Sequence, residues 1–291
     1  MKIILARHFG LCFGVRDAVA QARFLARQGP LTILGELVHN PVVTEQLASG
    51  GVHQGSLNDS GSQSKRVMIT AHGASDRQRK RWHDAGYEVA DATCPLVHHA
   101  HQELKRLVER GYFPVVIGKA GHVEVRGLTE DLKESFVFDE LSQLTDLPAR
   151  PRFGIIAQTT QPIDHVRRLV QGIRERYLEA EVLFVDTVCR PTKDRQSALQ
   201  NLIRDADTIV VVGGRHSNNT RQLVQSCRIG GRRAIHIERA EELDPADFSD
   251  ATVVGLTAGT STLPETVTAV WRRLEEISSA QINIQSKPKE S

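Results

Sequence analysis

Short apolar runs rich in Val and Ile alternate along the chain with amphipathic stretches. Each run is four to eight residues long, as a buried parallel strand is, and the stretches between several of them have the 3.6-residue period of a helix. The runs are KIILA (2–6), LTILGEL (31–37), RVMITA (66–71), FPVVIG (113–118), FGIIAQ (153–158), VLFVD (182–186), TIVVVG (208–213) and TVVGLTAG (252–259). This alternation predicts an α/β fold with mostly parallel sheets.

The length of 291 residues suffices for one large domain or for two to three small ones that share a core. We divide the chain into three α/β units, at residues 1–95, 96–187 and 188–278. Residues 279–291, SAQINIQSKPKES, form a polar C-terminal tail that we expect to be disordered or loosely docked.

Composition excludes several classes of protein. The formal net charge of +2 is too small to indicate a nucleic-acid partner. No apolar run approaches the roughly 20 residues that a membrane span needs. The N-terminus, MKIILARHFG, is no signal peptide, because its apolar part is too short. We therefore expect a cytoplasmic protein.

Three of the four cysteines share one position relative to the predicted elements. Cys12, Cys94 and Cys189 each follow a strand and precede a helix, whereas Cys227 lies inside a helical pattern and is predicted to be buried and structural. A helix N-terminus lowers the pKa of a thiol and favours the metal-binding thiolate. Three thiolates without a fourth are typical of an iron–sulfur cluster with one open iron, or of a zinc site with a bound water.

The stretch DATCPLVHHAH (91–101) offers a local alternative. Residues four apart share a face of a helix, so Cys94 and His98 would both reach one zinc ion.

Several other predicted strands end in small and polar residues. Ligands of open α/β sheets bind beyond the carboxyl ends of the strands, where glycines and helix N-termini accommodate phosphate. No GxGxxG or Walker pattern occurs, so a small phosphorylated metabolite is favoured over a nucleotide. The residues at these ends are His39, His72, His122, Glu124, Thr159, Ser217, Asn218, Asn219 and Ser261.

Glu124 is the only carboxylate in this set. Beside a bound anion its ionised form is disfavoured, and a carboxyl that stays protonated near neutral pH acts as an acid. The alternative is an ordinary surface glutamate.

The ordered motifs resemble those of the LytB/IspH family, the 4-hydroxy-3-methylbut-2-enyl diphosphate reductases, from about residue 1 to 275. The motifs are FGLCFGV, LGELVHNPVV, ITAHGAS, DATCPLV, GKAGHVEVRG, AQTTQ, DTVCRPTKDRQ, GGRHSNNT and GLTAGTS.

The resemblance implies an iron–sulfur oxidoreductase at the last step of the methylerythritol phosphate (non-mevalonate) route to isoprenoids. It also implies three α/β units in pseudo-threefold arrangement around a central cluster. The substrate would be (E)-4-hydroxy-3-methylbut-2-enyl diphosphate, and the products water, isopentenyl diphosphate and dimethylallyl diphosphate. Reduced ferredoxin or flavodoxin is the expected electron donor.

Roles follow by motif. Cys12, Cys94 and Cys189 would be the three cysteine ligands of a 4Fe–4S cluster with one open iron, and Glu124 the proton donor. Thr159 would act beside Glu124, near the hydroxymethyl group of the substrate. The residues implied to bind the diphosphate are His39, His72, His122, Ser217, Asn218, Asn219 and Ser261.

This assignment also addresses the local zinc alternative. Cys94 would find its metal partners far away in sequence, and His98, His99 and His101 would be packing or solvent residues.

The chain departs from the family pattern near the predicted site. Val123 stands where the family has a proline, Asn218 where many members have a serine, and Phe13 where a small residue is frequent. After Cys189, RPTKDRQ replaces the commoner ATxxRQ. These departures leave open a paralogue with a changed substrate, or a non-catalytic sensor of iron–sulfur or phosphorylated ligands. A zinc hydrolase is a third hypothesis, and it leaves the strand-end donors unexplained.

Overall fold

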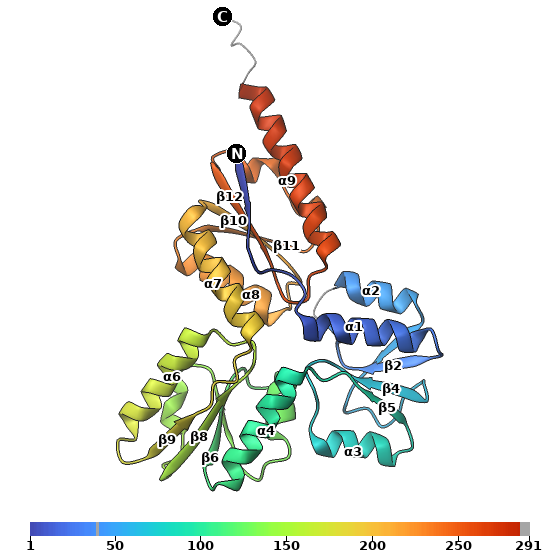
Figure 1. The fold of residues 1–291 in the computed structure, drawn as a ribbon, viewed down its shortest axis with the longest axis vertical. Helices are drawn as coiled ribbons and strands as arrows, with labels where there is room; N and C mark the ends of the chain where they lie inside the picture. Colours follow the sequence, from blue (N-terminus) through green and yellow to red (C-terminus); the bar gives the residue numbers. More distant parts are fainter. Residues whose placement is uncertain (39–40, 286–291) are drawn as a thin grey trace, which may run out of the picture. The chain divides into compact units, whose positions relative to one another are not determined.

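Three parallel four-stranded sheets with flanking helices form the computed structural model, which describes residues 1–38 and 41–285 (Figure 1). The α/β class predicted from the alternating runs is confirmed. All eight runs contain strands. Six of these strands are central in their sheets, where burial on both faces favours continuously apolar sequences, and the strands in KIILA and VLFVD lie at sheet edges and are partly buried.

The first two sheets have the same strand order. The first sheet has the order β3-β2-β4-β5, and the second has the order β7-β6-β8-β9. Their strands are β2 (Leu31–Leu34), β3 (Val52–Gly55), β4 (Arg66–Ile69), β5 (Glu88–Asp91), β6 (Phe113–Ile117), β7 (Phe136–Phe138), β8 (Arg152–Ala157) and β9 (Glu181–Phe184). In chain order within each sheet, both read second, first, third, fourth.

The third sheet repeats this order with a strand from the N-terminus. It reads β11-β10-β12-β1, from β10 (Thr208–Val212), β11 (Arg233–Ile237), β12 (Val253–Ala258) and β1 (Lys2–Leu5). β1 runs parallel to β12, with Lys2 opposite Val253 and Leu5 opposite Leu256. β1 therefore occupies the fourth position of the third sheet, although the predicted unit 1–95 had placed it with the first.

Helices connect and cover the strands, and the large ones begin shortly after strand ends. They are α1 (Phe13–Ala26), α2 (Pro41–Ser49), α3 (Asp76–Asp84), α4 (Pro95–Glu109), α5 (Val123–Thr129), η1 (Leu141–Asp146), α6 (Ile163–Arg176), α7 (Arg190–Asp205), α8 (Asn218–Ile229), η2 (Ala240–Glu242), η3 (Pro245–Phe248) and α9 (Pro264–Gln285). α4 packs on β6 and β8, while α8 packs on β10 and β11.

α9 extends further than the sequence pattern predicts. Its buried residues Val267, Val270, Leu274 and Ile277 recur at helical spacing. The helix continues through Gln285, so the first part of the predicted polar tail is helical. Residues 286–291 of that tail lie outside the described residues.

The chain divides into two compact units by its internal contacts. The larger unit, Phe13–Leu37 with Thr44–Thr192, contains the first and second sheets. The smaller unit, Met1–Cys12 with Val38–Val43 and Lys193–Ser291, contains the third sheet. The predicted boundaries at residues 95, 187 and 278 remain a proposal for the limits of the three repeated α/β units.

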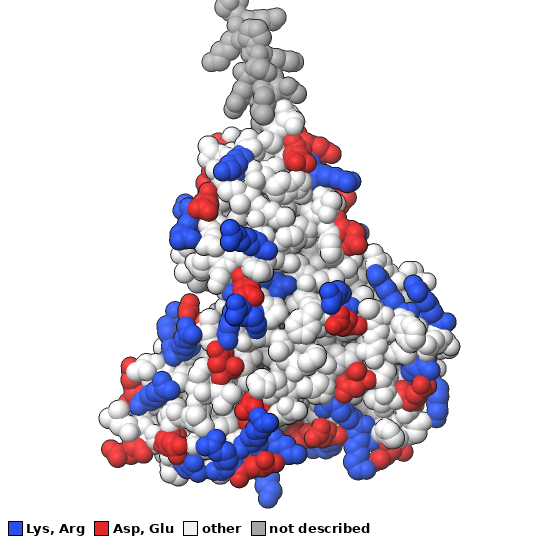
Figure 2. All heavy atoms as spheres, viewed as in Figure 1, with Lys and Arg blue, Asp and Glu red and all other residues white. Residues whose placement is uncertain are grey.

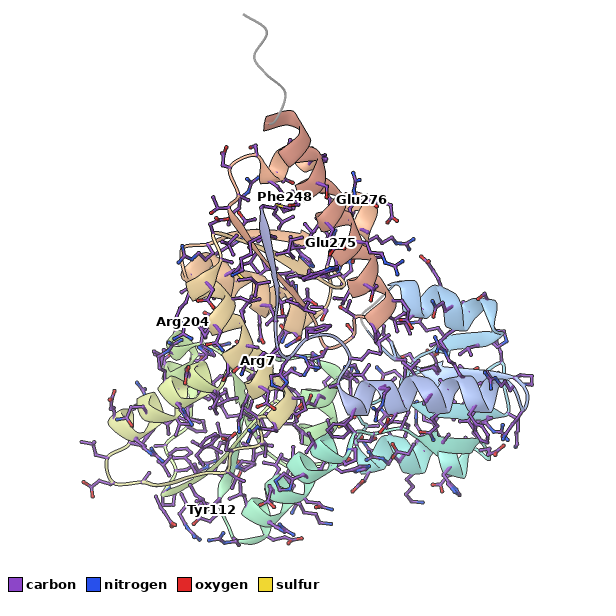
Figure 3. The ribbon with its side chains drawn as sticks, turned by 45° about the horizontal axis from the view of Figure 1, so that its top comes forward. Arg7, Tyr112, Arg204, Phe248, Glu275 and Glu276 are labelled. Carbon is purple, nitrogen blue, oxygen red and sulfur yellow. The ribbon has the colours of Figure 1, made fainter. Side chains whose placement is uncertain are left out.

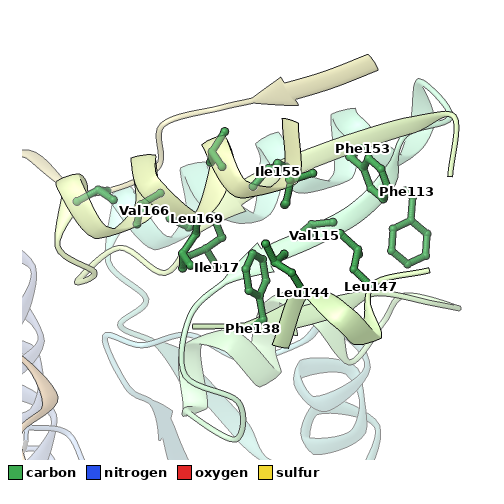
Figure 4. Close-up of a cluster of buried hydrophobic side chains, with 14 residues drawn as sticks. Phe113, Val115, Ile117, Phe138, Leu144, Leu147, Phe153, Ile155, Val166 and Leu169 are labelled. Atoms are coloured by element: carbon green, nitrogen blue, oxygen red, sulfur yellow. The ribbon is translucent and has the colours of Figure 1, made fainter. Parts of the chain in front are cut away.

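Each unit has its own apolar core. In the larger unit, side chains of β6 and β8 pack with Phe138 and with Leu144 of η1 beneath α6 (Figure 4). In the smaller unit, the fully buried Phe248 of η3 packs in a cluster with residues of β10, β12 and α9; Figure 3 labels it.

Two surface features bear on the sequence predictions. Positive and negative side chains are interspersed on the face shown in Figure 2, in keeping with the small net charge. None of the described helices is long and apolar enough to cross a membrane.

Truncation of a core residue of β8 should destabilise the larger unit. Ile155 is fully buried, so Ile155→Ala removes methyl groups and leaves a cavity, with an expected loss of about 2–5 kcal/mol in the free energy of unfolding. Urea unfolding measures it. The control is Leu178→Ala, because Leu178 is 82% exposed and its truncation should change stability by only about 0.5 kcal/mol. Equal losses in the two variants would contradict this assignment of the core.

Candidate active site

The predicted site residues follow particular positions of the repeated strand order. Ligand-binding candidates follow the first and third strands of each sheet, which adjoin where the strand order reverses and ligands of open α/β sheets bind. His72 follows β4, Glu124 follows β6, and Thr159 follows β8. The cysteines instead follow the fourth strands, β5, β9 and β1. His39 lies outside the described residues.

Glu124 is a buried carboxyl held by one threonine. It lies in the first turn of α5 and is 1% exposed, which excludes the surface-glutamate alternative. Its Oε1 accepts a hydrogen bond from the backbone N–H of Thr159 at 2.6 Å, and its Oε2 accepts one from Thr159 Oγ1 at 2.9 Å. Burial raises the pKa of Glu124 to about 7, against the two Thr159 bonds, which lower it.

Thr159 also connects the acid with a predicted cluster ligand. Its carbonyl oxygen accepts a hydrogen bond from the backbone N–H of Cys189 at 2.9 Å. The Cys189 Sγ lies 3.1 Å from the hydroxyl of Thr192, a fully buried residue of α7. One residue, Thr159, thus contacts both the carboxyl group and the loop that carries the cysteine. The sequence did not single out Thr192 as a partner of this thiol.

His122 and His72 lie together in the larger unit. His122 is the N-cap of α5, and its Nδ1 accepts from the Glu124 N–H at 3.2 Å. This bond places the ring proton of neutral His122 on Nε2 and makes that atom a donor. The rings of His72 and His122 meet edge to face, with centroids 5.6 Å apart. Two imidazoles that lie together after strands of the first and second sheets suit an anionic ligand.

Cys94 occupies the mouth of α4. It is the N-cap of that helix, with Pro95 as the first helical residue, as the sequence predicts. The Cys94 N–H donates to the Ala71 carbonyl at 3.0 Å, next to His72. A Cβ atom on Gly14 would lie 2.5 Å from the Cys94 Sγ, so any larger residue at position 14 would clash with the thiol in this position.

Cys12 lies in the smaller unit, in the loop after β1. Its N–H donates to the Thr260 carbonyl at 3.4 Å. Two residues earlier, Gly10 has a φ of +68°, and the buried Arg195 donates to its carbonyl at 2.6 Å. Arg195 is a further residue that the sequence did not single out, although it belongs to the motif after Cys189.

The end of β10 presents polar groups for an anion. Ser217 is the N-cap of α8, and because its Oγ accepts from the Thr220 N–H at 3.3 Å, its hydroxyl proton points elsewhere. The Asn219 Oδ1 accepts a hydrogen bond from the Thr260 N–H at 3.0 Å, which connects Asn219 to the loop that contains Ser261. The Asn218 Nδ2 is buried without a hydrogen-bond partner among the described residues, so its N–H groups are available to donate to a bound ligand.

The cysteines fit a metal–sulfur group by their chemistry. All three are half-buried cysteines that directly precede helices. Across residues 1–38 and 41–285, no three His, Cys, Asp or Glu gather as ligands of a single metal ion.

The remaining candidates have structural environments. Cys227 is fully buried, and burial raises the pKa of its thiol to about 12, as expected for a structural residue. His98 and His99 are exposed on α4. His101 is half-buried, and burial followed by the charge of Arg79 lowers its pKa to about 4. Within the described part of the chain, no three potential metal ligands gather around the DATCPLVHHAH stretch.

Two departures from the family pattern lie at the starts of helices. Val123 is the first residue of α5, and His122 still caps that helix. Phe13 is the first residue of α1, and its side chain is 39% exposed.

Comparison with known proteins gives concordant results. The sequence model of the family described as LytB protein matches residues 3–275. The 4-hydroxy-3-methylbut-2-enyl diphosphate reductase of Trichlorobacter lovleyi is 36% identical over 283 residues, which cover 96% of this chain and 100% of that protein.

Two solved structures are similar. One is an (E)-4-hydroxy-3-methyl-but-2-enyl diphosphate reductase, described as the terminal enzyme of the non-mevalonate pathway. It is 33% identical to this chain with a TM-score of 0.69, and the match covers 95% of this chain and 100% of that chain. The other, the E-1-hydroxy-2-methyl-but-2-enyl-4-diphosphate reductase from Plasmodium falciparum, is 24% identical with a TM-score of 0.84, covering 99% and 89%. The second shows the fold alone.

The raised pKa of Glu124 should make stability depend on pH. Protonation favours the folded state, because the pKa of about 7 exceeds the ordinary value of 4.5. This contribution is fully present below about pH 4.5 and is lost as the pH rises through about 7. Urea unfolding at pH 5 and pH 8 should show a smaller loss in Glu124→Gln than in wild type. The control is Glu179→Gln, because Glu179 is exposed. A Glu124→Gln variant that loses as much as wild type would contradict the assignment.

Proposed function

Because the chain belongs to the LytB protein family, we propose that it is a 4-hydroxy-3-methylbut-2-enyl diphosphate reductase. The observation that supports this most directly is the set of Thr159 contacts. They join a buried carboxyl group, Glu124, to the loop of a cysteine, Cys189, at the head of a helix. A protonated acid beside a ligand of a redox group is what a reductive dehydroxylation requires.

The proposed reaction removes the allylic hydroxyl of (E)-4-hydroxy-3-methylbut-2-enyl diphosphate. The C–O bond breaks, two electrons enter the allyl fragment, one proton leaves with the hydroxyl as water, and a second proton adds to carbon. Addition at one or the other end of the fragment gives isopentenyl or dimethylallyl diphosphate. This is the last step of the methylerythritol phosphate (non-mevalonate) route to isoprenoids.

Cys12, Cys94 and Cys189 are the proposed ligands of a 4Fe–4S cluster with one open iron, with the three α/β units in pseudo-threefold arrangement around it. Each thiol follows the fourth strand of its sheet and lies before a helix, where the thiolate is favoured. When bound, the cluster supplies electrons singly, and its open iron is a Lewis acid for the hydroxyl oxygen.

Glu124 donates the proton that leaves with the hydroxyl. With a pKa of about 7, the carboxyl is protonated in a large fraction of molecules at neutral pH. Thr159 fixes both carboxyl oxygens, so the acid keeps one orientation. Because Glu124 is 1% exposed, bulk water does not compete for that proton.

The diphosphate is held by imidazole, hydroxyl and amide donors. The proposed set is His39, His72, His122, Ser217, Asn218, Asn219 and Ser261. Support comes from the Nε2 donor of His122, the hydroxyl proton of Ser217 and the unpartnered Nδ2 of Asn218. These contacts orient the substrate, which lowers the entropic part of the barrier.

The electron donor is proposed to be reduced ferredoxin or flavodoxin, small proteins that carry single electrons. The cytoplasmic location predicted from the sequence is part of the same proposal.

Anaerobically purified protein should be brown and should convert the hydroxylated diphosphate under a strong reductant. Cys12→Ser, Cys94→Ser and Cys189→Ser should each lose the cluster and the activity, because each removes a thiolate. Iron and sulfide per chain and product formation measure this.

The matched control is Cys227→Ser, since Cys227 lies in the core of the smaller unit. It should retain iron, sulfide and turnover. Colourless protein with stoichiometric zinc would contradict the proposal, and binding of the diphosphate without turnover would favour a sensor.

Glu124→Gln should retain the cluster and lose most turnover. Removal of a positioned acid typically costs about 10²–10⁴-fold in rate. The rate constant for substrate conversion under single-turnover conditions measures this, with iron and sulfide counted in the same sample. Full activity in Glu124→Gln would remove the acid role from this residue.

A further inference from the structure

Arg79 of α3 donates hydrogen bonds to four groups, of which one, Asp76 Oδ1 at 3.3 Å, lies on α3 itself. Its Nε donates to Asp91 Oδ2 at 2.8 Å, its Nη2 donates to Thr93 Oγ1 at 3.2 Å, and its Nη1 donates to the Ala74 carbonyl. The side chain is 21% exposed; its bonds to Thr93 and Ala74 are partly buried, and its bond to Asp91 is exposed. A planar group with five fixed donors suits such a junction, and an ammonium does not.

Two of these contacts lie in the loop before Cys94. Asp91 ends β5, and its Oδ1 accepts from the Thr93 N–H at 2.8 Å and from the Thr93 hydroxyl. Thr93 directly precedes Cys94 and is 8% exposed. Arg79 and Asp91 together fix the conformation of the residue that presents the thiol.

The third contact lies in the loop of His72. Ala74 is two residues after His72, and the Cys94 N–H bonds to Ala71 in the same loop. A Cβ atom on Gly73 would lie 3.0 Å from Thr93 Cγ2, so the two loops pack closely. Arg79 therefore bonds to both loops from one side.

The start of α3 is itself anchored to the segment after α5. Ser75 Oγ donates to Glu130 Oε2 at 2.9 Å. The N–H groups of Asp76 and Arg77 donate to Asp131 at 2.6 and 3.2 Å. These bonds satisfy N-terminal amides of α3 and hold Arg79 at a defined place relative to α5, whose first turn carries Glu124.

We propose that Arg79 is a positioning residue that holds the Cys94 loop and the His72 loop in register for the reaction. Arg79 does not act on substrate itself. The inference rests on the proposed function, since it gives Cys94 the role of cluster ligand and His72 that of diphosphate ligand.

A cavity of about 610 Å³ adjoins Arg79, lined also by Asp91, His101 and Leu128. The space beside the guanidinium admits a shorter side chain and water without a steric clash. Replacement of Arg79 should therefore loosen the two loops while the fold remains intact.

The test compares Arg79→Lys and Arg79→Gln with wild type in full-length, anaerobically purified protein. Both variants should fold, and both should lose the cluster to a chelator roughly tenfold faster or more. The KM for the hydroxylated diphosphate should rise and kcat should fall, because both loops are displaced. Arg79→Lys should rescue little, since an ammonium cannot make the three bonds.

The decisive readout is the rate at which iodoacetamide alkylates individual cysteines after the cluster has been removed, followed by mass spectrometry. Cys94 should react faster in the Arg79 variants, and Cys189 in the same molecules should not change. Equal acceleration at both cysteines, or none at Cys94, would overturn the proposal. The matched control is Lys80→Ala on the same helix, because Lys80 is 75% exposed and pairs with Asp84 at the surface.

Thr93→Val tests the same contacts from the other partner and covers the case in which Arg79→Gln fails to fold. It should accelerate Cys94 alkylation, and combined with Arg79→Lys it should add little, because both changes remove one set of bonds. Fully additive effects would overturn the proposal. Wild-type protein that holds no iron and sulfide would overturn the proposed function instead, and the alkylation comparison would still decide the role of Arg79.

Discussion

The pairing of β1 with β12 is the interaction on which the arrangement of the predicted site depends. Without it, the third sheet would have three strands, and Cys12 would follow no strand of a sheet. With it, every sheet has the same order, and each cysteine follows a fourth strand. The repeat is therefore one of strand order and not of sequence, which is why no fixed sequence period marks it.

Burial of one carboxyl group is the second constraint. Taking Glu124 out of water disfavours its charge, and the Thr159 bonds offset only part of that cost. The same bonds connect Glu124 to the loop of Cys189. The pKa of Glu124 and the position of its carboxyl group thus depend on the same few groups. A change in the loop of Thr159 therefore alters both.

Much of the fold was predictable from the sequence, since central parallel strands are continuously apolar. The edge strands β1 and β9 have apolar runs and were predicted, whereas the edge strands β3, β7 and β11 were not singled out. A partly solvated edge strand can carry a short mixed sequence such as VHQG. The partner of β1 was also missed, because an apolar run shows that a strand forms but not which distant strand it joins.

The candidate site residues were predictable from the sequence, but the residues that hold them in position were not. The cysteines, histidines and Glu124 stand out at strand ends. Arg79 does not stand out, because α3 has the sequence DRQRKRWHD, with three arginines. Only the structure shows which groups accept hydrogen bonds from Arg79. Thr192 and Arg195 escaped notice for the same reason.

The strand order has a consequence for biosynthesis. Synthesis runs from the N-terminus, so β1 and Cys12 leave the ribosome before the other described strands, yet their sheet is incomplete until β12 (Val253–Ala258) has been made. The first two sheets are complete much earlier and have only local partners. If Cys12, Cys94 and Cys189 bind one cluster, as proposed, a nascent chain stalled before β12 would present Cys94 and Cys189 after complete sheets while Cys12 still lacked its own sheet.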